Sequence, residues 1–143
     1  MPLNNIFFHT EDISFALESE KEMVSWLVKL VEVHNRKVGE LNYIFCSDDY
    51  LLKMNQEHLS HDYFTDIITF DYCEKDVISG DLFISIERTN ENAKTFGKTQ
   101  MNELSRVIAH GLLHLLGFKD KSAEDIAEMR NMEAAALDML GDV

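Results

Sequence analysis

Two histidines, His110 and His114, lie four residues apart in the otherwise apolar segment 110–118. On a helix, side chains at positions i and i+4 share one face, so both imidazoles can bind one metal ion. Gly117 follows, and glycine readily adopts the left-handed conformation that ends a helix and turns the chain back. The returning chain brings Asp120 towards the same point. The spacing H-x3-H-x5-D therefore predicts a metal site formed by His110, His114 and Asp120.

Three protein ligands would leave a fourth position on the ion for water or substrate, which is the arrangement of a catalytic zinc site. Such an ion can polarise a phosphoryl oxygen or generate hydroxide. A zinc protease normally has H-E-x-x-H, with the glutamate as general base. Gly111 stands in the place of that glutamate, which argues against a protease. The alternative is a pair of ordinary helix histidines, one solvated and one packed in the core.

The sequence H-G-L-L-H-L-L-G-F at 110–118 resembles the corresponding motif of the YbeY family of metal-dependent bacterial endoribonucleases. Two upstream stretches are also similar to that family. T-D-I-I-T-F at 65–70 resembles its T-D-V-L-S-F, and G-D-L-F-I-S at 80–85 resembles its G-D-I-x-I-S. Asn55 and Glu103 also lie where the family pattern has them. The resemblance covers roughly residues 40 to 140.

The resemblance implies a zinc-dependent enzyme that cuts single-stranded RNA, in small-subunit ribosomal RNA maturation and ribosome quality control. It implies one zinc ion as cofactor. The expected partners are ribosomal RNA and ribosome or small-subunit proteins, with no DNA and no membrane. We expect residues 1–143 to form one YbeY-like metallohydrolase domain.

The chain departs from the family pattern at two places. Asp120 stands where the family usually has a third histidine. Aspartate also binds zinc through a carboxylate oxygen, so the site can survive with altered chemistry. Leu59 stands where the family usually has an arginine, four residues after the asparagine that Asn55 matches. If that arginine holds a phosphate, this chain must do so in another way.

Besides His114, two acidic residues are candidates for the catalytic machinery. Glu103 lies two helical turns before His110 on the same face, where it could orient that histidine or reach substrate. The alternative is a solvated helix glutamate. Asp66 lies in the upstream stretch 65–70 that resembles the family. Its alternative role is that of a turn residue at the start of a strand.

Four basic or titratable side chains are candidates for substrate binding. His58 and His61 lie close to Leu59 and could meet phosphate as imidazolium. Lys119 and Lys121 flank Asp120 and could contact phosphate at the rim of the site. All four can equally be ordinary solvated surface residues.

The formal net charge of −13 argues against a general nucleic-acid binder, because neutralised phosphates supply most non-specific affinity. Two other functions therefore stay open. One is a ribosome-assembly binding factor with a largely structural metal, and the other is a metal-dependent hydrolase of another substrate. Cys46 and Cys73 form no C-x-x-C pair, and the N-terminus lacks the features of a signal peptide. We therefore expect a cytoplasmic protein with two buried or half-buried thiols.

Apolar periodicity and capping residues predict an α+β fold, with a small mixed sheet of about four strands packed by about five helices. The sheet count rests on the resemblance as much as on the pattern. Ser19 with Glu22 and Ser122 with Asp125 suggest capping boxes, and Thr99 suggests the N-cap of the metal-site helix. The expected strands are 6–8, 13–15, 41–46, 67–72 and 82–86, and the last two are expected to pair as a hairpin. Two helices are expected over 48–58 and 87–96, and another begins at Ser19 and ends near Asn35 and Gly39. The metal-site helix is expected to begin at Thr99. The last helix is expected to begin at Ser122, with a buried face made of Ile126, Met129, Ala136, Leu137 and Leu140.

Overall fold

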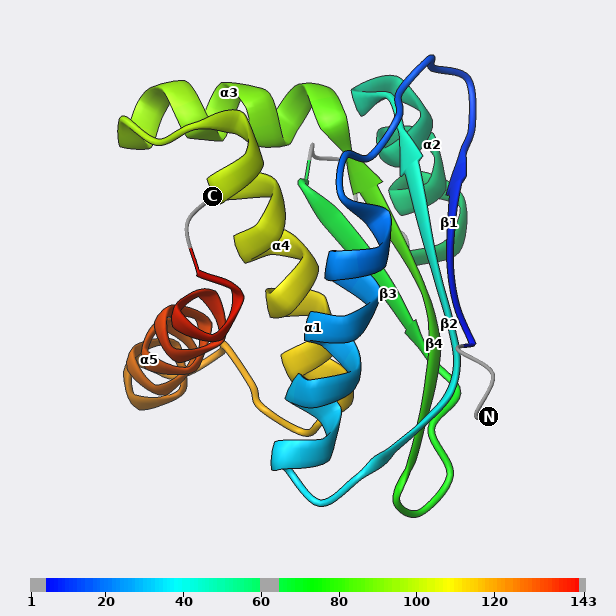
Figure 1. Cartoon of the computed structure of the whole chain (residues 1–143). Helices are drawn as coiled ribbons and strands as arrows, with labels where there is room; N and C mark the ends of the chain where they lie inside the picture. Colours follow the sequence, from blue (N-terminus) through cyan, green and yellow to red (C-terminus); the bar gives the residue numbers. More distant parts are fainter. Residues whose placement is uncertain (1–4, 60–64, 142–143) are drawn as a thin grey trace.

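The computed structural model describes residues 5–59 and 65–141. Within this part of the chain, four strands and five helices form one α+β unit, as predicted (Figure 1). No helix in the described ranges is long and apolar enough to cross a membrane. The elements are β1 (Ile6–Thr10), α1 (Glu20–Val33), β2 (Lys37–Cys46), α2 (Asp48–Leu59), β3 (Ile67–Asp71), β4 (Val77–Ser85), α3 (Ile86–Phe96), α4 (Gln100–Leu115) and α5 (Ala123–Leu140).

The sheet is mixed, and its strand order is β1-β2-β4-β3. β1 pairs with β2 and β2 with β4 in parallel, whereas β3 and β4 run antiparallel. The short turn between β3 and β4 confirms the expected hairpin. Because β3 is the last strand in this order, one of its edges is free of any other described strand, and α4 packs against β3 and β4.

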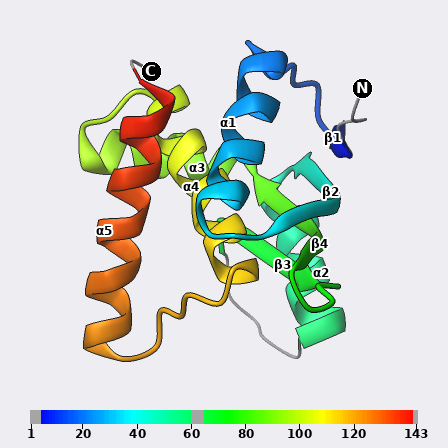
Figure 2. The same ribbon diagram turned by 60° about the horizontal axis from the view of Figure 1, so that its bottom comes forward.

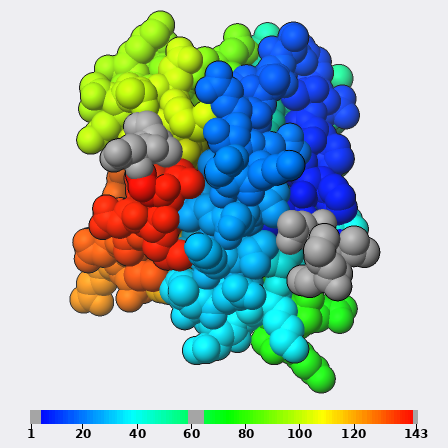
Figure 3. Space-filling model, viewed as in Figure 1, coloured from blue at the N-terminus to red at the C-terminus, as the bar shows by residue number. Residues whose placement is uncertain are grey.

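Helices cover both faces of the sheet. α1 and α4 lie on one face, α2 lies on the other, and α5 forms a further layer outside α1 and α4 (Figure 2). On the face shown in Figure 3, α1 and α5 lie side by side. The indole Nε1 of Trp26 on α1 donates a hydrogen bond of 2.7 Å to the carbonyl oxygen of Ala136 on α5. The main core lies between the sheet and α1, α4 and α5.

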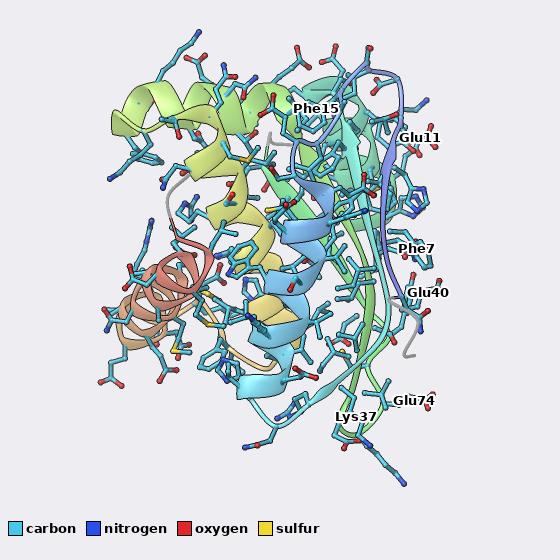
Figure 4. All side chains as sticks on the ribbon, in the orientation of Figure 1. Phe7, Glu11, Phe15, Lys37, Glu40 and Glu74 are labelled. Atoms are coloured by element: carbon cyan, nitrogen blue, oxygen red, sulfur yellow. The ribbon has the colours of Figure 1, made fainter. Side chains whose placement is uncertain are left out.

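Part of the α2 face of the sheet remains open to solvent. Phe7 and Glu40 point away from α1 in Figure 4, and the Phe7 side chain is exposed. The smaller apolar cluster under α2 contains Cys46, Leu51 and Ile68. The cysteine prediction is confirmed, since Cys46 is buried, Cys73 is half-buried and both are free.

Gly111 lets α4 approach the sheet closely. A Cβ at this position would lie 2.5 Å from Leu82 Cδ2 and 2.7 Å from Ile67 Cδ1, distances that real Cβ atoms do not show. The residue that replaces a protease's glutamate is therefore a packing residue. Its small size brings the histidine face of α4 next to β3.

Several local predictions are confirmed and others are wrong. Thr99 accepts a hydrogen bond from the Asn102 N–H and caps α4, and Ser122 and Asp125 form a capping box. Ser19 forms none, because it adopts a left-handed conformation with φ 57° and its side chain accepts no capping bond. The first helix ends at Val33, and Gly39, predicted to mark its end, lies inside β2 close to a register shift between Val38 and Leu41.

Two apolar segments are arranged differently from the prediction. Residues 13–15 form no strand. Instead, Phe15 packs edge-on against Phe45, with ring centroids 5.1 Å apart. On α5, Met129 and Ala136 are buried as expected, but Ile126 is 43% exposed. The buried stripe of α5 is completed by Glu133, which is 3% exposed.

Candidate metal centre

The C-terminal end of α4 carries the two histidines and turns the chain towards them. The Gly117 N–H donates to the His114 carbonyl at 3.0 Å, and the Phe118 N–H donates to the Leu113 carbonyl at 3.0 Å. Gly117 has φ 107°, a conformation that side chains rarely adopt. The chain therefore reverses at this glycine, as predicted, and brings Asp120 back over the helix face.

Three potential ligand atoms converge at this reversal. His110 Nε2 lies 3.0 Å from His114 Nε2. The Asp120 Oδ2 atom lies 3.3 Å from His114 Nε2 and 3.5 Å from His110 Nε2. Ligands about 2.0–2.1 Å from a tetrahedral zinc ion are roughly 3.3 Å apart. The three side chains therefore fit one ion, and they are the one group of its kind among the described residues.

Glu133 on α5 orients the first of these ligands. Its Oε2 atom lies 2.6 Å from His110 Nδ1. When Nδ1–H donates to this carboxylate, the lone pair of Nε2 is left pointing at the metal position. The sequence interpretation missed this residue. The available signal was a carboxylate in the buried stripe Met129, Glu133 and Ala136, which follows helical spacing.

Arg106 holds Glu133 in place. Its Nη1 donates to Glu133 Oε1 at 3.1 Å, and its Nε and Nη2 donate to both oxygens of Glu103 at 2.9 and 2.7 Å. The hydrogen bonds to Glu103 raise the pKa of Arg106, while burial opposes them. Burial alone would raise the pKa of Glu133, but the His110 hydrogen bond and the Arg106 charge outweigh it and lower that pKa. Glu133 is therefore an anion facing a ligand histidine.

Glu103 is buried and bonded to Arg106, and it neither bonds to His110 nor reaches the pocket surface. Its side chain is 1% exposed, so it is not a solvated helix glutamate. Both of its carboxylate oxygens accept from Arg106, and Glu133 occupies Nδ1 of His110. Glu103 thus acts on His110 only through Arg106 and Glu133, and it does not reach the pocket surface.

Asp66 lies at the pocket beside the histidines. Its Oδ2 is 3.9 Å from Arg106 Nη2, and the Asn92 amide donates to it at 3.5 Å. Burial raises the pKa of Asp66, and the positive charge of Arg106 only partly offsets this effect. A carboxyl group with a raised pKa in a metal pocket can exchange a proton near neutral pH more easily than an ordinary aspartate.

The pocket itself has a volume of about 430 Å³. It straddles the β3 edge, with α4 on one side and Asn55 of α2 on the other. Asn55 is 1% exposed. The lining residues are Asn55, Thr65, Asp66, Ile67, Ile68, Thr69, Asp71, His110, His114, Leu115 and Asp120.

None of the described residues expected to bind substrate lines the pocket. Lys119 and Lys121 are exposed and flank Asp120 in the chain, but neither is among the residues that line the pocket. His58 is exposed on α2, and its ring meets Phe70 edge-on at 6.4 Å, outside the pocket lining. His61 lies outside the described residues. The side chain of Leu59, at the arginine position, is likewise outside them.

A larger hollow lies elsewhere, near the turn between β3 and β4. Its walls carry Glu40, Glu74, Asp76 and Asp81, and no histidine or cysteine. Asp81 accepts a hydrogen bond from the Asn42 amide at 3.2 Å and does not contact the ligand histidines. This acidic hollow would repel phosphate, so we place the functional site at the smaller, histidine-lined pocket.

Comparison with known proteins agrees with this geometry. Residues 5–141 match the family described as endoribonuclease YbeY. This chain belongs to the YbeY family. A protein of Cytophaga hutchinsonii named endoribonuclease YbeY is 49% identical over 140 residues, covering 97% of this chain and 98% of its own. A YbeY endoribonuclease of Porphyromonas gingivalis is 47% identical over 135 residues, covering 94% of this chain and 89% of its own.

A solved structure also matches the YbeY family fold seen here. The solution structure of a protein from Thermotoga maritima superimposes with a TM-score of 0.67 at 27% sequence identity. The match covers 94% of this chain and 88% of the Thermotoga protein.

The two upstream stretches that resemble the family, 65–70 and 80–85, lie side by side in the β3–β4 pair. Next to this pair, the Ser85 N–H donates to the Asp66 carbonyl at 2.9 Å.

Proposed function

We propose that this chain is a zinc-dependent endoribonuclease that cuts single-stranded RNA in small-subunit ribosomal RNA maturation and ribosome quality control. The observation that carries the proposal is the convergence of His110, His114 and Asp120 on one point inside a pocket. Membership of the YbeY family supports RNA as the substrate and phosphodiester hydrolysis as the reaction. We further propose ribosome or small-subunit proteins as partners and the cytoplasm as the location.

A zinc ion held by these three ligands would supply a Lewis acid and lower the pKa of a water molecule bound to it. The protein's own contribution is to fix the geometry. Glu133 holds the His110 ring in one tautomer, and Arg106 holds Glu133. Asp66, whose carboxyl pKa is raised by burial, would accept or donate a proton at the pocket surface.

The acidic surface must be reconciled with an anionic substrate. The formal net charge is −13, so long-range attraction of RNA is absent. Local positive charge would come from the metal and from Lys119 and Lys121, which flank Asp120 in the chain, with His58 and His61 as further proposed phosphate contacts. We infer that a partner protein on the ribosome brings the enzyme to its RNA. This same charge favours the second candidate, an assembly factor whose metal is mainly structural.

The decisive experiment compares wild type with His114→Ala, with Glu128→Gln as a control on the exposed side of α5. Zinc content is measured by elemental mass spectrometry, and cleavage of single-stranded RNA is measured on the same samples. The proposal expects near-stoichiometric zinc and cleavage in wild type and control, and loss of both in His114→Ala. If His114→Ala still supports ribosomal RNA processing in cells that depend on it, the assembly-factor function is correct instead.

A further inference from the structure

The free edge of β3 presents its backbone to the metal pocket. In an antiparallel pair, alternate residues of an edge strand bond to the neighbouring strand and the others point outward. The Asp66 carbonyl accepts from the Ser85 N–H, and the Tyr72 N–H donates to the Ser79 carbonyl at 3.0 Å. Even-numbered residues of β3 therefore bond to β4. Thr69, opposite Leu82 in the register, directs its N–H and C=O away from the sheet.

This outward pair lies beside the proposed metal. Thr69 lines the same pocket as His110 and His114. Its outward neighbours carry local hydrogen bonds at the Ile67 carbonyl and at the Asp71 side chain, so of their backbone groups only the Ile67 carbonyl is occupied. The Ile67 carbonyl accepts from Thr65 Oγ1 at 3.4 Å, and the Asp71 carboxylate accepts from the Cys73 N–H at 2.8 Å. Within the described ranges no other strand pairs with this edge.

A donor and an acceptor on one residue complement the Watson–Crick edge of a nucleobase. Uracil, for example, offers N3–H as a donor next to a carbonyl acceptor, and the other bases also offer an adjacent donor and acceptor. We propose that the Thr69 backbone N–H and C=O bind the Watson–Crick edge of one unpaired base next to the metal. In a duplex that edge is occupied by the partner base, so the site admits unpaired RNA only. This inference rests on the proposed function and deepens it.

A nucleobase suits this edge better than an added peptide strand. Strand addition uses a row of main-chain hydrogen bonds along an exposed edge. β3 has only three outward positions, and the carbonyl of the first, Ile67, already accepts a hydrogen bond from Thr65 Oγ1, so the row open to a peptide strand is short. One base needs only one donor and one acceptor. The pocket of about 430 Å³ has room for such a planar group beside the histidines.

The test uses two isomeric RNA oligomers with the zinc-loaded full chain. In the first, each uridine carries a methyl group on N3, which removes the donor from the Watson–Crick edge. In the second, the methyl group is on C5, away from that edge. The proposal expects kcat/KM for cleavage to be at least about tenfold lower for the N3-methyl oligomer. Equal kcat/KM for the two isomers would overturn the base-edge site and leave the ribonuclease function intact.

Binding is followed independently through the Thr69 amide resonance of the zinc-depleted chain, so that the readout does not need cleavage. The proposal expects this resonance to shift with the 5-methyl oligomer and not with the N3-methyl isomer. If neither oligomer is cleaved but this shift pattern holds, the base site stands and the nuclease function fails. If neither oligomer is cleaved and neither shifts Thr69, both are overturned. A Thr69 shift produced by a short threonine peptide at lower concentration than the 5-methyl oligomer would also overturn the base site.

The Thr69→Pro variant adds a check at the residue itself. Proline removes the outward N–H and is tolerated at edge positions whose N–H faces away from the sheet. We expect the preference for the 5-methyl over the N3-methyl oligomer to shrink towards one in this variant. A folded Thr69→Pro protein, judged by its circular dichroism, that keeps the full preference would contradict the assignment to Thr69.

Discussion

His110 Nδ1 and Glu133 Oε2 lie 2.6 Å apart, although 23 residues separate them in the chain. This contact joins α5 to the metal-binding face of α4. Because this hydrogen bond leaves Nε2 of His110 free for the metal, we expect its loss to lower metal affinity more than it lowers the stability of the fold. For Glu133→Gln we expect zinc affinity to fall about 10- to 100-fold, as for other partners that orient ligand histidines. Competition with a chromogenic chelator measures this affinity.

The matched control for this variant is Glu128→Gln, an identical change at an exposed position of the same helix. It should leave the zinc affinity within about twofold of wild type, since it touches no ligand. If Glu133→Gln binds zinc as tightly as this control does, the orienting role of Glu133 is wrong.

Arg106 is the cation that makes two buried carboxylates tolerable. Glu103 is 1% exposed, Glu133 is 3% exposed, and both are bonded to Arg106. Arg106→Met leaves these carboxylates without their shared partner, and we expect it to destabilise the protein by roughly 3 kcal/mol in urea unfolding. Adding Glu103→Gln to Arg106→Met should recover part of that loss, because one uncompensated charge is removed. A loss below about 1 kcal/mol would show that the network contributes little.

Gly111 is predicted to be sensitive to the smallest enlargement. Gly111→Ala places a methyl group 2.5 Å from Leu82 Cδ2 and 2.7 Å from Ile67 Cδ1. Although alanine favours helix, overpacking should dominate and lower the free energy of unfolding by about 1–3 kcal/mol. Ile67→Val removes the Cδ1 atom, so it should cost less in the Gly111→Ala background than in wild type. Additive effects in this double-mutant cycle would contradict the proposed clash.

Asp66 should make stability depend on pH in a defined direction. Its folded-state pKa lies above the ordinary value of 3.8, because burial disfavours the charged form. As pH rises past the unfolded-state pKa, the unfolded chain loses this proton first, so wild type loses stability until the folded-state pKa is passed. The Asp66→Asn variant lacks this loss. Its stability relative to wild type should therefore rise as the pH increases from about 4, until the folded-state pKa of Asp66 is passed.

Urea unfolding of the metal-free proteins across this pH range measures the difference. Asp49→Asn, at an exposed position of α2, serves as the control and should show no such trend. A stability difference between Asp66→Asn and wild type that stays constant with pH, or falls as pH rises, would contradict the effect of burial on Asp66.

The metal group could be predicted from the sequence because its geometry is local. His110 and His114 share one helix face, and a glycine-terminated helix end returns Asp120 to them within a few residues. The partner of His110 could not be predicted in this way. Glu133 reaches it only because α5 docks on α4 at one particular angle, which no local pattern specifies.

Glu103 shows how correct periodicity can suggest the wrong contact. Helical spacing places it on the His110 side of α4, but Arg106 is closer, at i+3, and bonds both of its oxygens. The apolar segment 13–15 shows the same limit for the fold. Its short apolar run predicts an edge strand, yet Phe15 packs against Phe45 and the segment pairs with no strand in the part of the chain that the structure describes. Helices with strong caps and the β3–β4 hairpin depend on neighbouring residues, and these were predicted correctly.

Trp26 gives this protein a built-in optical reporter. It is the single tryptophan in the sequence, it is 3% exposed, and its indole donates to the Ala136 carbonyl on α5. Emission from this one ring thus senses whether α5 is seated, and α5 also carries the carboxylate that orients His110. Fluorescence of the unmodified chain can therefore follow, in real time and without any attached dye, whether filling or emptying the metal centre disturbs the helix behind it.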